Sequence, residues 1–310
     1  FFFKQKTAYE ITYGDWSSDV CSSDPPAPDV APPEPVAAGT AGAEVQITTT
    51  LPRPFWEHGI AESWFAAVDR AERFIYVEDQ YFRAPMLNER IRARMQAVPG
   101  LALVVVTKPV NEWTDPGCAW TYRSHQGFAK AFGERYFTFQ LRAFDTAPSA
   151  SSAPDFGGAS FDTDGVFADI DVHSKMLIVD DVFMSVGSAN KNDRGMVYEG
   201  EMNAVVVDAT WVRDQRRRIL GELTRRPAPF SDDAAVWAAQ LRAAAKANDA
   251  VAKRWGDLGR HVALGGAPLG ADLLPQGFLY TLGFREVEDC LIESVGPDMT
   301  GVHDGGVAPE

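Results

Sequence analysis

The sequence predicts an α/β fold in which a mixed β-sheet is sandwiched between helices. Two observations lead to this prediction. Short apolar runs alternate with segments whose apolar residues recur every three or four positions, as strands and amphipathic helices do. Three strand-like segments then follow one another without a helix, at Val172–Val179, Val182–Val186 and Ala204–Val207. Alternation followed by consecutive strands is typical of a mixed sheet covered on both faces.

Each element is expected on its own pattern, and the folded part begins near Val45. Leu101–Val106, for example, is a valine-rich run of the kind found in strands buried on both faces. The stretch 145–169 is rich in Ser, Ala, Gly, Asp and Pro and is expected to form a long loop. The Arg216–Arg218 run is expected to face solvent. Besides the three strands above, the expected elements are a helix through Ile60, Trp64, Val68 and Ala71, a strand at Phe74–Val77, a helix through Leu87, Ile91 and Met95, strands at Leu101–Val106 and Phe139–Phe144 with a helix around Tyr122–Glu134 between them, and a basic helix at Trp211–Arg226.

The domain organisation follows from shifts in composition. Residues 1–24 show neither the order of a signal peptide nor a sustained period, and they are similar to a translated sequencing-adapter read, so we expect an artefact. Residues 25–44 are rich in Pro and Ala and are typical of a linker. Residues 45–226 are expected to form one domain. Residues 227–310 are expected to form a helical C-terminal extension of unassigned role, with a helix at Asp232–Trp255.

Charge and composition narrow the partners. The formal charge of −14 on 310 residues disfavours broad affinity for nucleic acid, although a local basic cleft is compatible with it. No apolar run reaches the length of a membrane span. The three cysteines show no metal-ligand spacing, and neither a metal nor another cofactor is expected.

One segment, Asp171–Val207, carries a dense polar motif. It matches the pattern H-x-K-x4-D-x6-G-S-x-N, which chance would give at on the order of one start point in tens of millions. The matching residues are His173, Lys175, Asp180, Gly187, Ser188 and Asn190.

The motif suits a phosphodiester. Residues two apart on a strand share a face, so His173 and Lys175 are expected to point the same way, with Ser174 turned back. An ammonium group can hold the non-bridging oxygens while an imidazole attacks phosphorus or protonates the leaving oxygen. Ser188 and Asn190, again two apart, supply neutral hydrogen-bond donors. Glu201 could fix the tautomer of a histidine by accepting a hydrogen bond from its N–H.

This segment resembles the second H-x-K motif of the phospholipase D superfamily. The resemblance implies a phospholipase D-like mixed sheet flanked by helices, forming one half of a two-lobed enzyme. It implies the catalytic set His173, Lys175, Asp180 and Glu201, with Asp180 mostly structural, and the phosphate-binding residues Ser188 and Asn190. One departure is Gly195, where many members carry serine.

A second block, Ile75–Phe82 (IYVEDQYF), resembles one found in true phospholipases D, with Asp79 where asparagine is common. It favours glycerophospholipid substrates over a homodimeric nuclease-like phosphodiesterase or a non-catalytic fragment. Superfamily chemistry uses two histidines and this chain has one H-x-K, so we expect either a missing N-terminal half or a second copy as homodimer. Peripheral membrane contact is compatible with this reading. The headgroup, the choice between hydrolysis and transfer, and the localisation are not predicted.

Overall fold

The computed structural model describes residues 44–109, 118–144, 167–226, 230–258 and 270–283. These residues belong to one unit, Ala43–Glu310, whereas the expectations for residues 1–24 and nearly all of the linker lie outside the described residues. The helices and strands are β1 (Val45–Leu51), β2 (Glu57–His58), α2 (Gly59–Val68), β3 (Phe74–Asp79), α3 (Pro85–Ala97), β4 (Ala102–Val106), α4 (Cys118–Phe132), η1 (Gly133–Arg135), β5 (Tyr136–Phe144), β6 (Phe167–Ile170), β7 (Lys175–Val179), β8 (Phe183–Gly187), η2 (Arg194–Tyr198), β9 (Glu201–Val207), α5 (Ala209–Thr224), α6 (Ala234–Leu258), η3 (Ala271–Leu273) and β10 (Leu279–Thr281).

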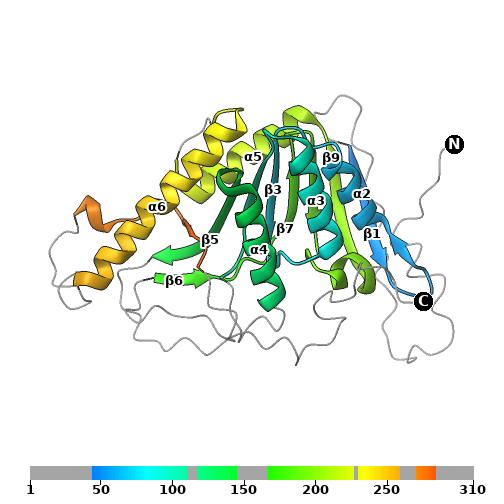
Figure 1. The fold of residues 1–310 in the computed structure, drawn as a ribbon, viewed down its shortest axis with the longest axis horizontal. Coiled ribbons are helices and arrows are strands. Elements are labelled where there is room, and N and C mark those ends of the chain that lie inside the picture. The colour runs from blue at the N-terminus through cyan, green and yellow to red at the C-terminus, as the bar shows by residue number, and fades with distance from the viewer. Residues whose placement is uncertain (1–43, 110–117, 145–166, 227–229, 259–269, 284–310) are drawn as a thin grey trace, which may run out of the picture. The chain divides into compact units, whose positions relative to one another are not determined.

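All the described strands join one mixed sheet (Figure 1). Its order is β10-β5-β4-β3-β7-β8-β9-β1-β2, and β6 also pairs with β5. The β3–β4 and β4–β5 pairs are parallel and are connected through helices, whereas every pair from β3–β7 to β1–β2 is antiparallel. The predicted mixed sheet is therefore confirmed. Among the described residues, no helix is both long enough and apolar enough to cross a membrane.

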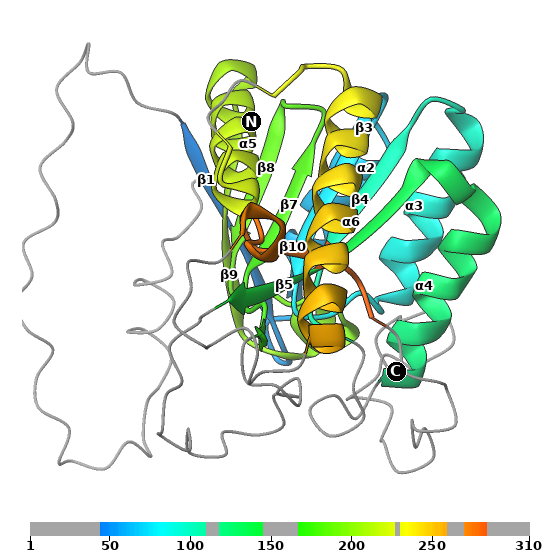
Figure 2. The ribbon, with the colours of Figure 1, turned by 90° about the vertical axis from the view of Figure 1, so that its left-hand side faces the viewer.

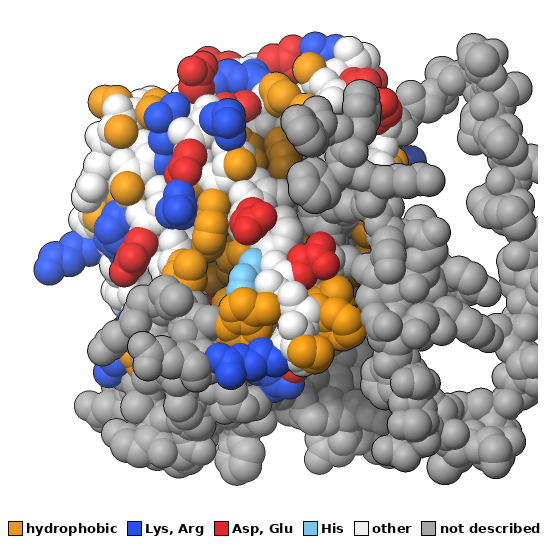
Figure 3. All heavy atoms as spheres, turned by 90° about the vertical axis from the view of Figure 1, so that its right-hand side faces the viewer, with side chains coloured by type: hydrophobic (Ala, Val, Ile, Leu, Met, Phe, Trp, Pro, Cys, Tyr) orange, Lys and Arg blue, Asp and Glu red, His pale blue; other side chains and the backbone are white. Residues whose placement is uncertain are grey.

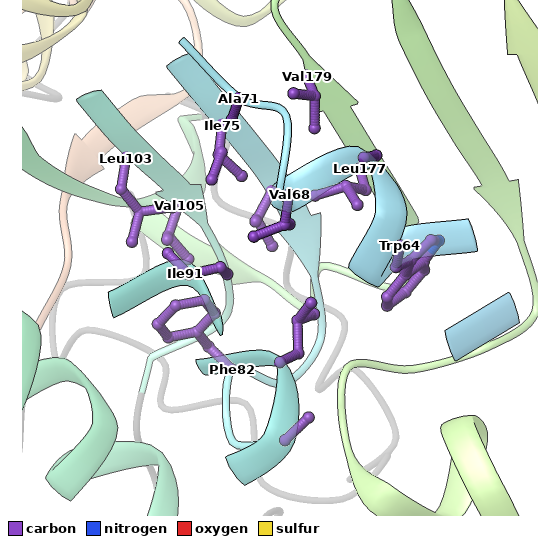
Figure 4. Packing of buried hydrophobic residues seen from close by; sticks show 14 of the residues in the cluster. Trp64, Val68, Ala71, Ile75, Phe82, Ile91, Leu103, Val105, Leu177 and Val179 are labelled. Carbon is purple, nitrogen blue, oxygen red and sulfur yellow. The ribbon is translucent and has the colours of Figure 1, made fainter. Parts of the chain in front are cut away.

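One face of the sheet packs against α2, α3 and α4. Alternate residues of β3, β4 and β7 point to this side, so Ile75, Leu103 and Leu177 pack together with Trp64 of α2 and Ile91 of α3 (Figure 4). All five side chains are completely buried. Burying a large apolar side chain contributes about 1.5–3 kcal/mol, so this layer holds the sheet and the helices in a fixed relation.

The opposite face packs against α5 and α6. Phe74 and Ile178 point to this side and meet Leu220 of α5 and Trp237 of α6, and all four are completely buried. Figure 2 shows α5 and α6 on one side of the sheet and α2, α3 and α4 on the other. The predicted sandwich of helices around the sheet is confirmed.

Strands β1 and β2 were not among the expected elements, and the structure differs from the sequence-based expectations in three further places. Strand β6 lies at the end of the stretch expected to be loop and pairs with β5. Within residues 227–310, β10 pairs with β5, an edge strand that was not expected, and α6 buries Trp237 against the sheet. Arg216 was expected to face solvent but is buried, because its guanidinium pairs with Asp181 at 2.5 and 3.0 Å.

Candidate active site

The candidate site lies at one end of the sheet because neighbouring strands run in opposite directions there. Strand β7 begins at Lys175 and β9 begins at Glu201, while β3 ends at Asp79 and β8 ends at Gly187. In the antiparallel register Asp79 lies opposite Lys175, and Gly187 lies opposite Asn203, two residues beyond Glu201. Segments distant in sequence thus meet at one end of the sheet.

Lys175 is the buried cation at this end of the sheet. Its side chain is buried, and Nζ donates a hydrogen bond to the carbonyl oxygen of His173 at 2.9 Å. Burial lowers the pKa of Lys175 below its ordinary value of 10.5, and the carboxylates of Asp79, Glu201 and Asp171 act in the opposite direction. The lysine is therefore surrounded by carboxylates that favour its charged form.

His173 is exposed and lies two residues before Lys175, the first residue of β7. The residue between them is anchored to the other face of the sheet. Ser174 donates to Glu78 Oε1 at 2.6 Å, and the Tyr76 hydroxyl donates to Glu78 Oε2 at 2.7 Å. Ser174 is turned away from Lys175 as the strand pattern predicts, and this anchor fixes the backbone that carries His173.

Ser188 and Glu201 are in direct contact. The Ser188 hydroxyl donates to the Glu201 carboxylate, and its oxygen accepts a hydrogen bond from the Met202 N–H at 3.0 Å. Ser188 is exposed and Glu201 is half-buried, so both can be reached from solvent. The contact that the structure gives Glu201 is thus to Ser188, and a role in orienting a histidine stays a prediction.

Gly187, at the end of β8, and Gly195, in the segment that follows, stand where the surrounding backbone leaves no room for a side chain. A Cβ on Gly187 would lie 2.3 Å from the Met202 carbonyl oxygen, which explains the glycine of the motif. A Cβ on Gly195 would lie 2.7 Å from both the backbone N and the backbone O of Asn190. Serine, common at this position in the superfamily, would therefore displace Asn190. The Asn190 segment is held further by Asn203, whose Oδ1 accepts from the Ala189 N–H at 3.2 Å.

Asp180 is not part of this constellation. It follows β7 at the end opposite Lys175, and its carboxylate accepts from the backbone N–H groups of Glu72, Arg73 and Phe74 at 2.6–2.8 Å. Asp180 and Asp181 have φ of 55° and 59°, and the Val182 N–H donates to the Val179 carbonyl oxygen at 3.0 Å. This is the geometry of a β-turn with positive φ at both central positions, after which Val179 pairs with Phe183. The contacts of Asp180 are structural, so a direct catalytic role is not supported.

The other five predicted residues lie at the same end of the sheet. Lys175, Ser188 and Glu201 do so through the contacts above, and His173 and Asn190 lie within two residues of Lys175 and Ser188. Sequence reasoning missed two further polar residues here, Asp79 and Lys191, both completely buried. Asp79 lies in the block Ile75–Phe82, which the sequence had already singled out. Its neighbour Lys191 could not be identified from a local pattern.

The chain is similar in sequence to phospholipases D and cardiolipin synthases. It is 28% identical to phospholipase D zeta 1 of Arabidopsis thaliana over 187 residues, which cover 52% of this chain and 17% of that protein. It is 24% identical to a cardiolipin synthase of Staphylococcus aureus over 209 residues, which cover 67% of this chain and 35% of that protein. The chain thus spans well under half the length of the curated relatives it matches. No family model matches it.

Matches among solved structures include the phospholipase D family member Nuc of Salmonella typhimurium, at 17% identity and a TM-score of 0.37. That match covers 57% of this chain and 91% of Nuc. Phosphatidylserine synthase of Haemophilus influenzae matches at 15% identity and a TM-score of 0.37, over 56% of this chain and 38% of that protein.

Proposed function

We propose that this chain supplies the second H-x-K half of a phospholipase D-type phosphodiesterase or phosphatidyltransferase that acts on glycerophospholipids. The observation that carries the proposal is that Lys175 and the Ser188–Glu201 pair lie at the same end of the sheet, the end that His173 leads into. A cation, a hydroxyl and an adjacent imidazole are the groups that a phosphodiester requires. The similarity to phospholipase D and cardiolipin synthase points to a lipid as the diester.

In the proposed reaction, an imidazole nitrogen from the other half attacks phosphorus, and the bond from phosphorus to the headgroup oxygen breaks. His173, protonated, gives its proton to that oxygen. The now neutral His173 then takes a proton from water or an alcohol, whose oxygen attacks phosphorus and releases the first histidine. Lys175 stabilises the non-bridging oxygens throughout, and Ser188 and Asn190 donate hydrogen bonds to them.

The partner is an N-terminal half with its own H-x-K or a second copy of this chain. One imidazole cannot easily stand on both sides of phosphorus, so the proposed turnover requires a second histidine. The phospholipase-type block Ile75–Phe82 favours the first of these partners. Basic and acidic side chains are interspersed on the face shown in Figure 3, and the net charge of −14 gives no general attraction for nucleic acid.

The test is headgroup release from phosphatidylcholine and phosphatidylglycerol vesicles, measured together with molar mass by light scattering. We expect a monomer without turnover when the full chain is alone, and turnover once an N-terminal half bearing an H-x-K is supplied. In the restored enzyme His173→Ala should lower the rate by about 10²-fold or more. Lys175→Met should do the same.

Lys130→Met is the matched control because Lys130 is an exposed lysine in the last turn of α4. It should leave the rate unchanged. An active dimer of the chain alone, inactivated by His173→Ala, would replace the two-half account with a symmetric site. Restored turnover that survives His173→Ala would contradict the proposed chemistry. Cleavage of a nucleotide diester but of neither lipid would contradict the substrate class.

A further inference from the structure

Asp79, the last residue of β3, joins two segments of the candidate site. Its carboxylate is completely buried. Oδ1 accepts a hydrogen bond from the Tyr81 N–H at 2.8 Å, and Oδ2 accepts one from the Lys191 N–H at 3.1 Å. Since Lys191 follows Asn190 directly, one carboxylate connects the segment after β3 to the segment that carries the phosphate-binding candidates.

Lys191 is an unusual residue for its environment. It is 0% exposed, and Nζ lies 4.5 Å from the centre of the Trp64 ring. Within the described ranges Nζ has no hydrogen-bond partner. A buried ammonium is strongly unfavourable unless a counter-charge is close by. The attraction to Asp79 acts in this direction, and the ring face of Trp64 adds a cation–π contact.

We propose that the Asp79 carboxylate positions the Ser188–Asn190 segment through the Lys191 N–H. Asp79 and the Lys191 ammonium, which are not in direct contact, act as a buried charge pair that sets the net charge beside Lys175. The proposal rests on the proposed function, because it gives these residues a part in holding the phosphate site. Asp79 lies directly opposite Lys175 in the β3–β7 register. The pair also explains why an aspartate stands where the phospholipase block commonly has asparagine: a neutral amide would leave the Lys191 ammonium without its counter-charge.

The electrostatics of the two side chains agree with this geometry. Burial raises the pKa of Asp79 to about 6, although Lys191, the two backbone hydrogen bonds and Lys175 all act to lower it. Burial lowers the pKa of Lys191 to about 8, against the attraction of Asp79. Between about pH 6 and 8 both members are therefore charged. Below that window Asp79 gains a proton and the net charge beside Lys175 becomes more positive.

The same pKa shifts determine how the stability of the fold depends on pH. A carboxyl whose pKa is raised by folding stabilises the fold at low pH, and that contribution is lost as pH rises through about 6. A lysine whose pKa is lowered by folding stabilises the fold at high pH, and that contribution is lost as pH falls through about 8. Of the other charged groups, Lys175 on β7 acts on Asp79, and Glu201 on β9 acts on Lys175. Arg83 after β3 acts on Asp193, whose pKa burial raises to about 7. Differences between variants are therefore the readout, since Asp193 is common to all of them.

The first measurement is thermal unfolding of Asp79→Asn, Lys191→Met and the double variant in the full chain at pH 7. Each single change leaves one buried charge without its partner and should lower the Tm by about 10 °C. The double variant should recover most of that loss, because no unpaired charge remains. Additive losses, or a double variant that does not fold, would overturn the charge pair.

The second measurement is binding of inorganic sulfate, whose charge is constant between pH 5 and 9. Wild-type affinity should fall from pH 5 to pH 7 by about threefold more than that of the double variant, since only the wild type loses a positive increment as Asp79 ionises. Equal pH profiles would overturn the role beside Lys175 even if the stabilities are coupled. A wild type that binds no sulfate would remove the phosphate site, and with it the positioning role, leaving unfolding to decide the charge pair alone.

Discussion

Gly195 offers a sharp test of how tightly the phosphate-binding segment is packed. In Gly195→Ala the new Cβ would lie 2.7 Å from the N and O of Asn190 and 3.3 Å from the carbonyl carbon of Ala189. All three neighbours are backbone atoms, so the segment itself has to move. Overpacking of this kind costs about 1–3 kcal/mol. Shifting the Gly195 N–H away from Asn192 Oδ1, which it meets at 2.9 Å, adds about 1 kcal/mol. We expect a total loss of about 2–4 kcal/mol.

The assay is urea unfolding of the full chain, with Gly200→Ala as control. Gly200 lies five residues further on, with no atom within 4 Å of its Cβ position and without a positive φ. Alanine there should be neutral or stabilising by up to about 1 kcal/mol, because it restricts the unfolded chain. If Gly195→Ala were as stable as Gly200→Ala, the close approach to Asn190 and the reasoning from it would be refuted. Sulfate affinity should fall in Gly195→Ala as well.

Three further substitutions test the framework around the site. Asp180→Ala removes the acceptor of three backbone N–H groups and should lower the free energy of unfolding by about 2–4 kcal/mol, measured by urea denaturation. Arg216→Leu leaves the buried Asp181 carboxylate with only the longer ion pair to Arg73, at 3.7 Å, and should cost about 3 kcal/mol, whereas adding Asp181→Asn should recover part of it in a double-mutant cycle. Trp64→Phe removes the 2.8 Å donor to Ser185 and should cost about 1 kcal/mol or more by the same method, and no change would mean that this bond is not formed.

The sequence predicted the fold where the hydrophobic pattern was strong. Leu101–Val106 and Phe74–Val77 are uninterrupted apolar runs, and both lie in central strands of the observed sheet. Strands β6 and β10 were missed because they are four and three residues long and lie at the edge, where pairing with β5 rather than local propensity makes them strands. Arg216 was misjudged because helical spacing places a residue on a face without saying what covers that face.

The candidate site was predicted only in part. The spacing of His173, Lys175 and Ser188 is local, so the sequence alone indicated which residues lie at one end of the sheet. The Asp79–Lys191 contact joins residues 112 apart. Such a pair depends on the antiparallel register of several strands, and no local pattern reports it. Asp180 shows the converse: a motif position can be demanded by a turn rather than by chemistry.

The pairing of β1 with β9 has a consequence for how the protein folds. Thr48 and Asn203 are 155 residues apart and share a hydrogen bond, and Thr50 lies opposite Glu201 in the register. Closing so long a loop has a large entropic cost and slows folding. On the ribosome, β1 emerges long before its partner strand exists. Glu201 can therefore reach its final setting only late in synthesis, and a nascent chain that stops short of β9 contains the histidine and the lysine but no assembled site.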